Sequence, residues 1–146
     1  MPNAGGANEI QVLAIHAAAT LFMTGLIWVI QIVHYPLLAI VGPGQLKEYA
    51  RKHAARITLI VAPVMFIELG AGAWLAATRA DTTAIIALAL LAVIWVSTFA
   101  VQVRLHGRLQ RGDASAVALL TRSNWVRTIA WSVRGALSVL MLVRAV

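Results

Sequence analysis

Four long runs with almost no charged residues constrain this chain more than any other feature. They cover residues 10–46, 57–78, 82–103 and 128–143. Only two charged side chains interrupt them, Glu68 and Arg134. A helix of about 20 apolar residues spans the hydrocarbon core of a bilayer. A soluble domain has about a quarter of its residues charged, whereas this chain is 12% charged. The sequence therefore predicts an integral membrane protein.

The predicted fold is an all-α, membrane-spanning four-helix bundle, formed by one domain over residues 1–146. The expected spans are about residues 12–40, 46–78, 82–106 and 115–143, after a loose segment at residues 1–8. Gly and Pro in the "GPG" sequence end the first helix. Asp81 can cap the third helix, and Pro63 is expected to kink the second.

The positive charges are distributed unevenly over the connections between the spans. Nine Lys or Arg residues lie in the connections around residues 35–56 and 104–127, and two, Arg79 and Arg144, lie on the opposite side. Because cytoplasmic loops carry an excess of Lys and Arg, these connections are expected to be cytoplasmic and both termini periplasmic or extracellular. Topology and lipid headgroups thus account for the net charge of +7, and no nucleic-acid partner is expected.

A weak internal repeat relates the two halves of the chain. A shift of 71 residues maps Gln31 onto Gln102 and Arg56 onto Arg127, and it also aligns the apolar runs. We interpret the halves as two helical hairpins in parallel orientation, related by a pseudo-twofold axis along the membrane normal. Functional sites of such repeats lie near their interface.

Polar side chains gather near the cytoplasmic ends of all four spans. Residues three or four apart share a helix face, and Gln31 with His34 and Gln102 with His106 are such pairs. Because a polar stripe facing lipid is costly, these residues are expected to face inward and form a pocket in the cytoplasmic half of the bundle. The predicted pocket residues are Gln31, His34, Tyr35, His53, Arg56, Gln102, His106, Asn124, Arg127, Trp131 and Arg134.

Glu68 and Arg134 lie inside predicted spans, where an unpaired charge is expensive and usually functional. One prediction is that they form a buried ion pair that fixes the packing of the second and fourth helices. The alternative is a direct catalytic role for Glu68. His16 lies farther out along the first helix and is expected at the outer interface.

Two cofactors would suit the histidines. His34, His53 and His106 are a candidate metal triad, because imidazole binds Zn, Cu, Fe and Ni and three protein ligands with an open position are typical of catalytic sites. Neighbouring amides such as Gln31 and Gln102 could then orient the rings. The alternative cofactor is haem b, with His34 and His106 as opposed axial ligands. The absence of cysteine excludes thiolate sites and thiol catalysis.

A third chemistry needs no cofactor. Arg56, Arg127 and Arg134 could bind an anionic group, while the histidines carry protons. A purely structural role is also open, in which the histidines bond backbone carbonyls freed by Pro36 and the helix ends.

The leading functional hypothesis is a membrane-embedded, metal- or haem-dependent oxidoreductase that acts on a lipophilic substrate. Its catalytic residues would be His34, His53, His106 and Glu68, and the other pocket residues would bind substrate. The alternatives are a transporter or binding protein for a small or anionic solute, and an accessory subunit of a larger membrane complex. The lipid bilayer is the expected partner, and a homo-oligomer stays open because no motif fixes a symmetry.

Three local motifs resemble those of a group of small uncharacterised bacterial four-span membrane proteins. They are HYP at residues 34–36, HxxR at 53–56 and NWxRTxxW at 124–131. The resemblance covers nearly the whole chain. It implies a bacterial inner-membrane protein and implies no particular activity.

Overall fold

Helices make up most of the computed structural model, which describes residues 4–145. The α-helices are α1 (Ala4–Val29), α2 (Tyr35–Leu38), α3 (Pro43–Arg79), α4 (Thr82–Ser97), α5 (Val103–Gln110) and α6 (Ala116–Val143). Two π-helical segments, η1 (Ile30–His34) and η2 (Thr98–Gln102), join α1 to α2 and α4 to α5. No strand occurs between residues 4 and 145, so the predicted all-α fold is confirmed.

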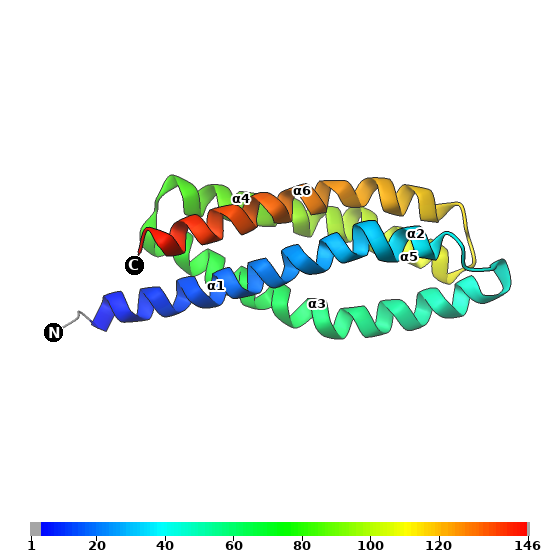
Figure 1. Cartoon of the computed structure of the whole chain (residues 1–146), viewed down its shortest axis with the longest axis horizontal. Helices are drawn as coiled ribbons and strands as arrows, with labels where there is room; N and C mark the ends of the chain where they lie inside the picture. The colour runs from blue at the N-terminus through cyan, green and yellow to red at the C-terminus, as the bar shows by residue number, and fades with distance from the viewer. Residues whose placement is uncertain (1–3, 146) are drawn as a thin grey trace.

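The helices form four rods that are long and apolar enough to cross a membrane. They are Asn8–Leu38, Pro43–Arg79, Thr82–Gln110 and Ala116–Val143. The rods run up and down as a bundle, as predicted (Figure 1). We call the end with the chain termini and the 80–81 turn the terminal end. The end with the loops at 39–42 and 111–115 is called the basic end, because most of the Lys and Arg residues lie there.

Two helices extend beyond the spans predicted from the sequence. α1 begins at Ala4, within the segment that was expected to be loose, and α5 continues to Gln110, beyond the predicted span of about residues 82–106. Gly107 lies inside α5, because a single glycine weakens a helix without ending it. The chain turns only at Gly112, where φ is +91°, a conformation that glycine adopts without strain.

Each rod packs against two neighbours and faces the fourth across the bundle. α1 and α4 each pack against α3 and α6, whereas α1 and α4 are diagonal to each other. α3 and α6 form the other diagonal pair. The π segments η1 and η2 lie in the diagonal pair of rods that open the two hairpins, which fits the interpretation of two repeated hairpins.

The buried apolar side chains form three layers along the bundle. The layer at the basic end contains Ile30, Tyr35, Leu38, Leu46, Ala50, Leu105, Leu109, Ala116, Val117 and Leu120. The middle layer contains Met23, Ile27, Met65, Leu91, Ile94, Ala130 and Trp131. The layer at the terminal end contains Leu13, Leu75, Ala84, Ala87 and Met141.

The outside of the bundle is apolar and much of its inside is polar. Large apolar side chains such as Ile40, Leu59 and Val96 are 79%, 78% and 65% exposed. The buried polar or charged residues are His16, Thr20, Gln31, Glu68, Ser97, Gln102, Asn124, Arg127, Thr128, Arg134 and Ser138. Soluble proteins rarely expose apolar patches of this extent to water, whereas apolar side chains on the outside of a bundle are stable in contact with lipid. The structure therefore fits a multi-pass membrane protein in contact with the bilayer.

α3 stands away from the other rods at the level of the π segments. It packs against α1 and α4 on one side of this level and against α5 on the other, but its backbone does not come close to η2. Pro63 lies inside α3, where it removes the hydrogen bond to the Leu59 carbonyl. Figure 1 shows α3 bent along its length, as a proline inside a helix predicts. The separation leaves room for the cavity described next.

Candidate functional site

The two π segments place one buried glutamine from each hairpin in the core. Gln31 is 3% exposed and Gln102 is 2% exposed. Gln31 accepts a bond from Asn124 Nδ2 (2.8 Å), and Gln102 Nε2 donates to Ser123 Oγ (3.0 Å). Tyr35 Oη donates to Gln102 Oε1 (3.4 Å). π segments frequently occur at functional sites, and here they turn both amides toward α6.

Arg127 is a buried cation with no acidic partner. Its side chain on α6 is 7% exposed, and Nη1 donates to Asn124 Oδ1 (3.2 Å). Nε is buried without a partner. No ion pair of the residues 4–145 involves Arg127, and neither Nε nor Nη2 donates to another described residue. The Nε–Nη2 edge is one of the two-pronged faces with which arginine binds a carboxylate, and here it is free.

The three histidines of the predicted pocket come together as stacked rings. The His34 and His53 centroids are 4.0 Å apart with 18° between planes, and those of His53 and His106 are 5.8 Å apart with 25° between planes. We call these residues the histidine stack. Tyr49 extends it toward the basic end, with its ring stacked 6.0 Å from that of His34 and its hydroxyl 3.4 Å from His34 Nδ1.

The histidine stack does not have the geometry of a metal triad. The lone pair of an imidazole nitrogen lies in the ring plane, so nearly parallel rings direct their lone pairs side by side and not toward one point. Among the described residues, no three His, Cys, Asp or Glu side chains are placed to hold a metal ion. The hypothesis of a three-histidine metal site thus gains no support from the arrangement of its own ligands.

A haem between His34 and His106 is also a poor fit. Opposed axial ligands need the whole thickness of a porphyrin between their rings. Here the His53 ring stacks against both His34 and His106. It occupies the space that the porphyrin would need.

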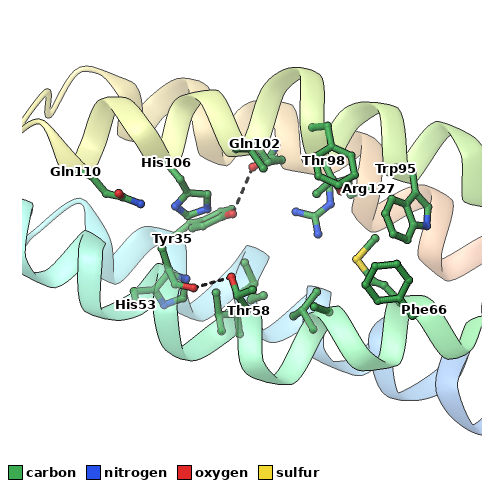
Figure 2. Close-up of a pocket in the computed structure, with 18 residues that line it drawn as sticks. Tyr35, His53, Thr58, Phe66, Trp95, Thr98, Gln102, His106, Gln110 and Arg127 are labelled. Carbon is green, nitrogen blue, oxygen red and sulfur yellow. Dashed lines mark hydrogen bonds between the residues drawn. The ribbon is translucent and has the colours of Figure 1, made fainter.

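A cavity of about 380 Å³ lies between α3 and the rod formed by α4, η2 and α5. Figure 2 shows its residues, with the Arg127 guanidinium in the space between the two ribbons. Ligand sites typically measure about 300–1,000 Å³. The cavity is lined by Ile30, Tyr35, His53, Ala54, Ile57, Thr58, Val61, Ala62, Met65, Phe66, Trp95, Thr98, Phe99, Gln102, Val103, His106, Gln110 and Arg127.

The predicted pocket residues divide into four groups. Those that line the cavity are Tyr35, His53, Gln102, His106 and Arg127. Gln31, His34 and Asn124 lie behind its wall as partners of lining residues. Arg56 is exposed on the surface, although it follows His53 by three residues, and therefore does not reach the site. Trp131 and Arg134 are fully buried away from the cavity.

Glu68 and Arg134 form the predicted ion pair, with Arg134 Nη2 3.2 Å from Glu68 Oε1. The pair crosses the diagonal between α3 and α6. Thr20 Oγ1 on α1 donates to Glu68 Oε1 (2.6 Å), and Arg134 Nη1 donates to the Ala87 carbonyl on α4. We call His16, Thr20, Glu68 and Arg134 the ion-pair cluster. It connects all four rods.

His16 belongs to the ion-pair cluster and not to the outer interface. It is 1% exposed, and its Nε2 lies 3.5 Å from Arg134 Nη2. Because arginine has only donors, Nε2 acts as the acceptor. The expectation from the sequence was wrong, because it considered only how far His16 lies along the helix. The four-residue spacing to Thr20 was the signal that both face inward.

Sequence reasoning missed the apolar wall of the cavity. Phe66, Trp95 and Phe99 line it. The ring centroid of Trp95 lies 5.6 Å from that of Phe66 and 5.5 Å from that of Phe99. In the sequence they cannot be distinguished from the many aromatic and aliphatic residues that face lipid.

Comparison with known proteins provides no match to a family model, to a curated protein or to a solved structure. The resemblance to the four-span bacterial group therefore stays a prediction.

Proposed function

We propose that this protein is an integral membrane protein that binds a partly apolar, singly charged anion in the cavity between α3 and η2. The observation that supports this most is the free Nε–Nη2 edge of Arg127, on a side chain that is 7% exposed. A buried charge without a partner is costly. A carboxylate from a ligand would supply both the missing charge and two parallel hydrogen-bond acceptors.

The other groups at the cavity suit the same kind of ligand. The amide and hydroxyl groups near Arg127 already form hydrogen bonds within the protein, as Tyr35 does with Gln102. They therefore do not need a ligand as a partner. The single cation matches one negative charge, because a dianion such as phosphate would leave charge uncompensated. The largely apolar wall favours a ligand with an apolar body.

The charge distribution supports placing this cavity in the cytoplasmic half of the membrane-spanning bundle. The basic end carries nine Lys or Arg residues, counting Arg127, against Arg79 and Arg144 at the terminal end. By the positive-inside rule, the basic end faces the cytoplasm and both termini face the periplasm. The motif resemblance adds the proposal that the membrane is a bacterial inner membrane.

The leading hypothesis from the sequence, an oxidoreductase with metal or haem, is less well supported than anion binding. The residues that would hold either cofactor do not fit it, because the rings of the histidine stack are parallel and in contact. His53 and His106 line the cavity, where either could exchange a proton with a bound ligand. Acid–base chemistry on the anion is therefore the form of catalysis that these residues could support.

Transport across the membrane is also less well supported than binding. The cavity reaches Met65 and Phe66 on α3, and the Glu68–Arg134 pair crosses the core immediately beyond. A solute could pass only if this pair and its bonds to α1 and α4 separated. A binding site with access from one side needs no such rearrangement.

The proposal is tested by binding of octanoate to the purified protein in lipid nanodiscs, measured by isothermal titration calorimetry. Arg127→Met should weaken binding about 10- to 100-fold, the range for hydrogen bonds to charged groups. Arg127→Lys should fall in between, because lysine keeps the charge but lacks the two-pronged edge. Arg122→Met removes an exposed cation and should leave binding unchanged. Equal affinity in Arg127→Met and the wild type would refute the proposal.

A further inference from the structure

The mouth of the cavity faces the lipid. Phe66, Phe99 and Val103 line the cavity and are also 61%, 58% and 52% exposed on the outside of the bundle. They belong to α3 on one side and to η2 and α5 on the other, at the level where α3 stands away from η2. A residue that is exposed and lines a cavity lies at its opening. The opening is therefore sideways, into the bilayer.

The polarity changes from the mouth to the back of the cavity. Arg127 comes from α6, which does not pack against α3, so its guanidinium lies at the back (Figure 2). Three of the four exposed lining residues at the mouth, Phe66, Phe99 and Val103, are aromatic or aliphatic, and the fourth is Thr58. A ligand that fits this arrangement has its anionic group inside and its apolar part toward the lipid.

The size of the cavity limits how much of the apolar part it can enclose. Its lining residues on α3 extend from His53 to Phe66, which is roughly 20 Å along a helix. Its volume of about 380 Å³ is near the lower limit for small-molecule sites. A long and narrow space of this volume accommodates one hydrocarbon chain, and a phospholipid with two chains and a headgroup would not fit.

We infer that the ligand is a single-chain, lipid-derived monocarboxylate that enters sideways from the bilayer. Its carboxylate binds the Nε–Nη2 edge of Arg127, and its chain passes between Phe66 and Phe99 into the acyl layer. This inference rests on the proposed function. It adds the class of ligand and the route by which the ligand arrives.

The test uses a long-chain fatty acid with a photoreactive diazirine in the middle of its chain, the part that would lie at the mouth, added to the protein in nanodiscs. After irradiation, mass spectrometry should locate adducts on residues 62–66 and 95–103. Unlabelled dodecanoate should compete, and acetate should not. Ala62→Phe places a large side chain in the cavity and should reduce this labelling at least tenfold. Ala73→Phe lies on the same helix at an exposed position and should have no effect.

Three results would overturn the inference. Labelling spread evenly over the lipid-facing helices would show a ligand dissolved in the bilayer and not bound. Competition by acetate as strong as by dodecanoate would show a site for water-borne anions, and the proposed function would then survive. No saturable labelling together with no octanoate binding would refute both. If Ala62→Phe does not fold, Thr58→Trp at an exposed lining position replaces it.

Discussion

Two buried arginines of α6 differ in what neutralises them. Arg134 is fully buried and pairs with Glu68 at 3.2 Å. Arg127 is nearly as buried but bonds only to the neutral Asn124 amide. Buried cations are normally paired, and the charge of Arg134 is neutralised within the fold by Glu68. The second has no charged partner among the described residues, and this contrast between two residues is the basis of the functional proposal.

Gly135 provides a residue-scale prediction about how closely α1 and α6 pack. A Cβ at this position would lie 3.0 Å from Thr24 Oγ1, which itself donates to the Trp131 carbonyl. Gly135→Ala should therefore destabilise the bundle by about 1–3 kcal/mol, the usual range for overpacking. The measurement is thermal unfolding in detergent followed by circular dichroism.

Gly25 is the matched control for Gly135. It lies on the same helix pair, but a Cβ there meets nothing within 4 Å. Alanine is favoured over glycine inside a helix by about 1 kcal/mol, so Gly25→Ala should leave stability unchanged or raise it. If both variants lost stability equally, the close approach at Gly135 would not be the cause.

Some contacts between single residues could be predicted from the sequence, and others could not. The Glu68–Arg134 pair was predictable, because two charges inside lipid-spanning helices must find each other. The parallel stacking of His34, His53 and His106 was not, since ring orientation depends on side-chain rotamers that the sequence does not specify. The sequence thus predicted which histidines meet but not what they could bind.

At the scale of elements, the predicted cap of α4 is confirmed. Asp81 Oδ1 accepts the Ala84 N–H (2.8 Å), and Asp81 Oδ2 accepts from Arg79 Nε (2.8 Å). The Arg79 hydrogen bond and the Ala84 N–H both lower the pKa of Asp81 below its usual value. Asp81 thereby links the end of α3, through Arg79, to the start of α4, through Ala84.

The cap leads to a prediction with a defined pH dependence. Asp81→Ala should cost about 1 kcal/mol at neutral pH, whereas Asp81→Asn should keep the cap and lose only the contribution of the charge. Because the pKa of Asp81 is lower in the folded state, this contribution is present at neutral pH and is lost progressively as the pH falls below about 4, through the lowered pKa of the folded state.

The measurement compares chemical unfolding of the wild type and Asp81→Asn at pH 7 and pH 3. The Asp81 side chain is 37% exposed, so solvent screens its charge and the difference at pH 7 should be a fraction of a kcal/mol. A difference that grew on acidification would have the wrong sign and would contradict this account of the turn.

The π segments were outside the reach of sequence reasoning. A π-helix has an extra residue per turn and is rare. No residue in the sequences "IQIVH" and "TFAVQ" predicts this conformation. The positions become favourable once Gln31 and Gln102 can bond partners on α6. Tertiary contacts therefore select the backbone here, while the α-helices follow from apolar runs and turn residues.

At the scale of the whole molecule, the ion-pair cluster joins all four rods through buried polar contacts. Removing one charge would leave the other buried and unpaired, which typically costs about 3–5 kcal/mol. Glu68→Met and Arg134→Met should each destabilise the bundle by roughly this amount. The double variant should lose much less than the sum, because it leaves no buried charge.

This prediction is checked by a double-mutant cycle from unfolding in SDS. Losses that add up in the double variant would show that the pair is not coupled. Octanoate affinity serves as a second readout, and it should stay unchanged in every folded variant because Glu68 and Arg134 do not line the cavity.

The overall architecture was the most predictable property of this chain. Four apolar runs separated by Gly, Pro and charged residues are sufficient for four spans, and the burial of polar side chains inside an apolar exterior follows from the solvent being lipid. The polar side of the cavity was predictable, but its apolar wall and its size were not, because they depend on how far the bent α3 stands from η2. Its apolar lining has the same composition as the lipid-facing surface.

The most direct test of the central claim measures the distance between Arg127 and the carboxylate of a bound ligand. Solid-state NMR on protein with ¹⁵N-labelled arginine and ¹³C-carboxyl dodecanoate detects carbon–nitrogen pairs through their dipolar coupling. We predict coupling at hydrogen-bonding distance to one arginine, which disappears in Arg127→Lys and persists in Arg122→Met. Absence of coupling, or coupling unchanged in Arg127→Lys, would contradict the claim that this buried guanidinium binds the anion.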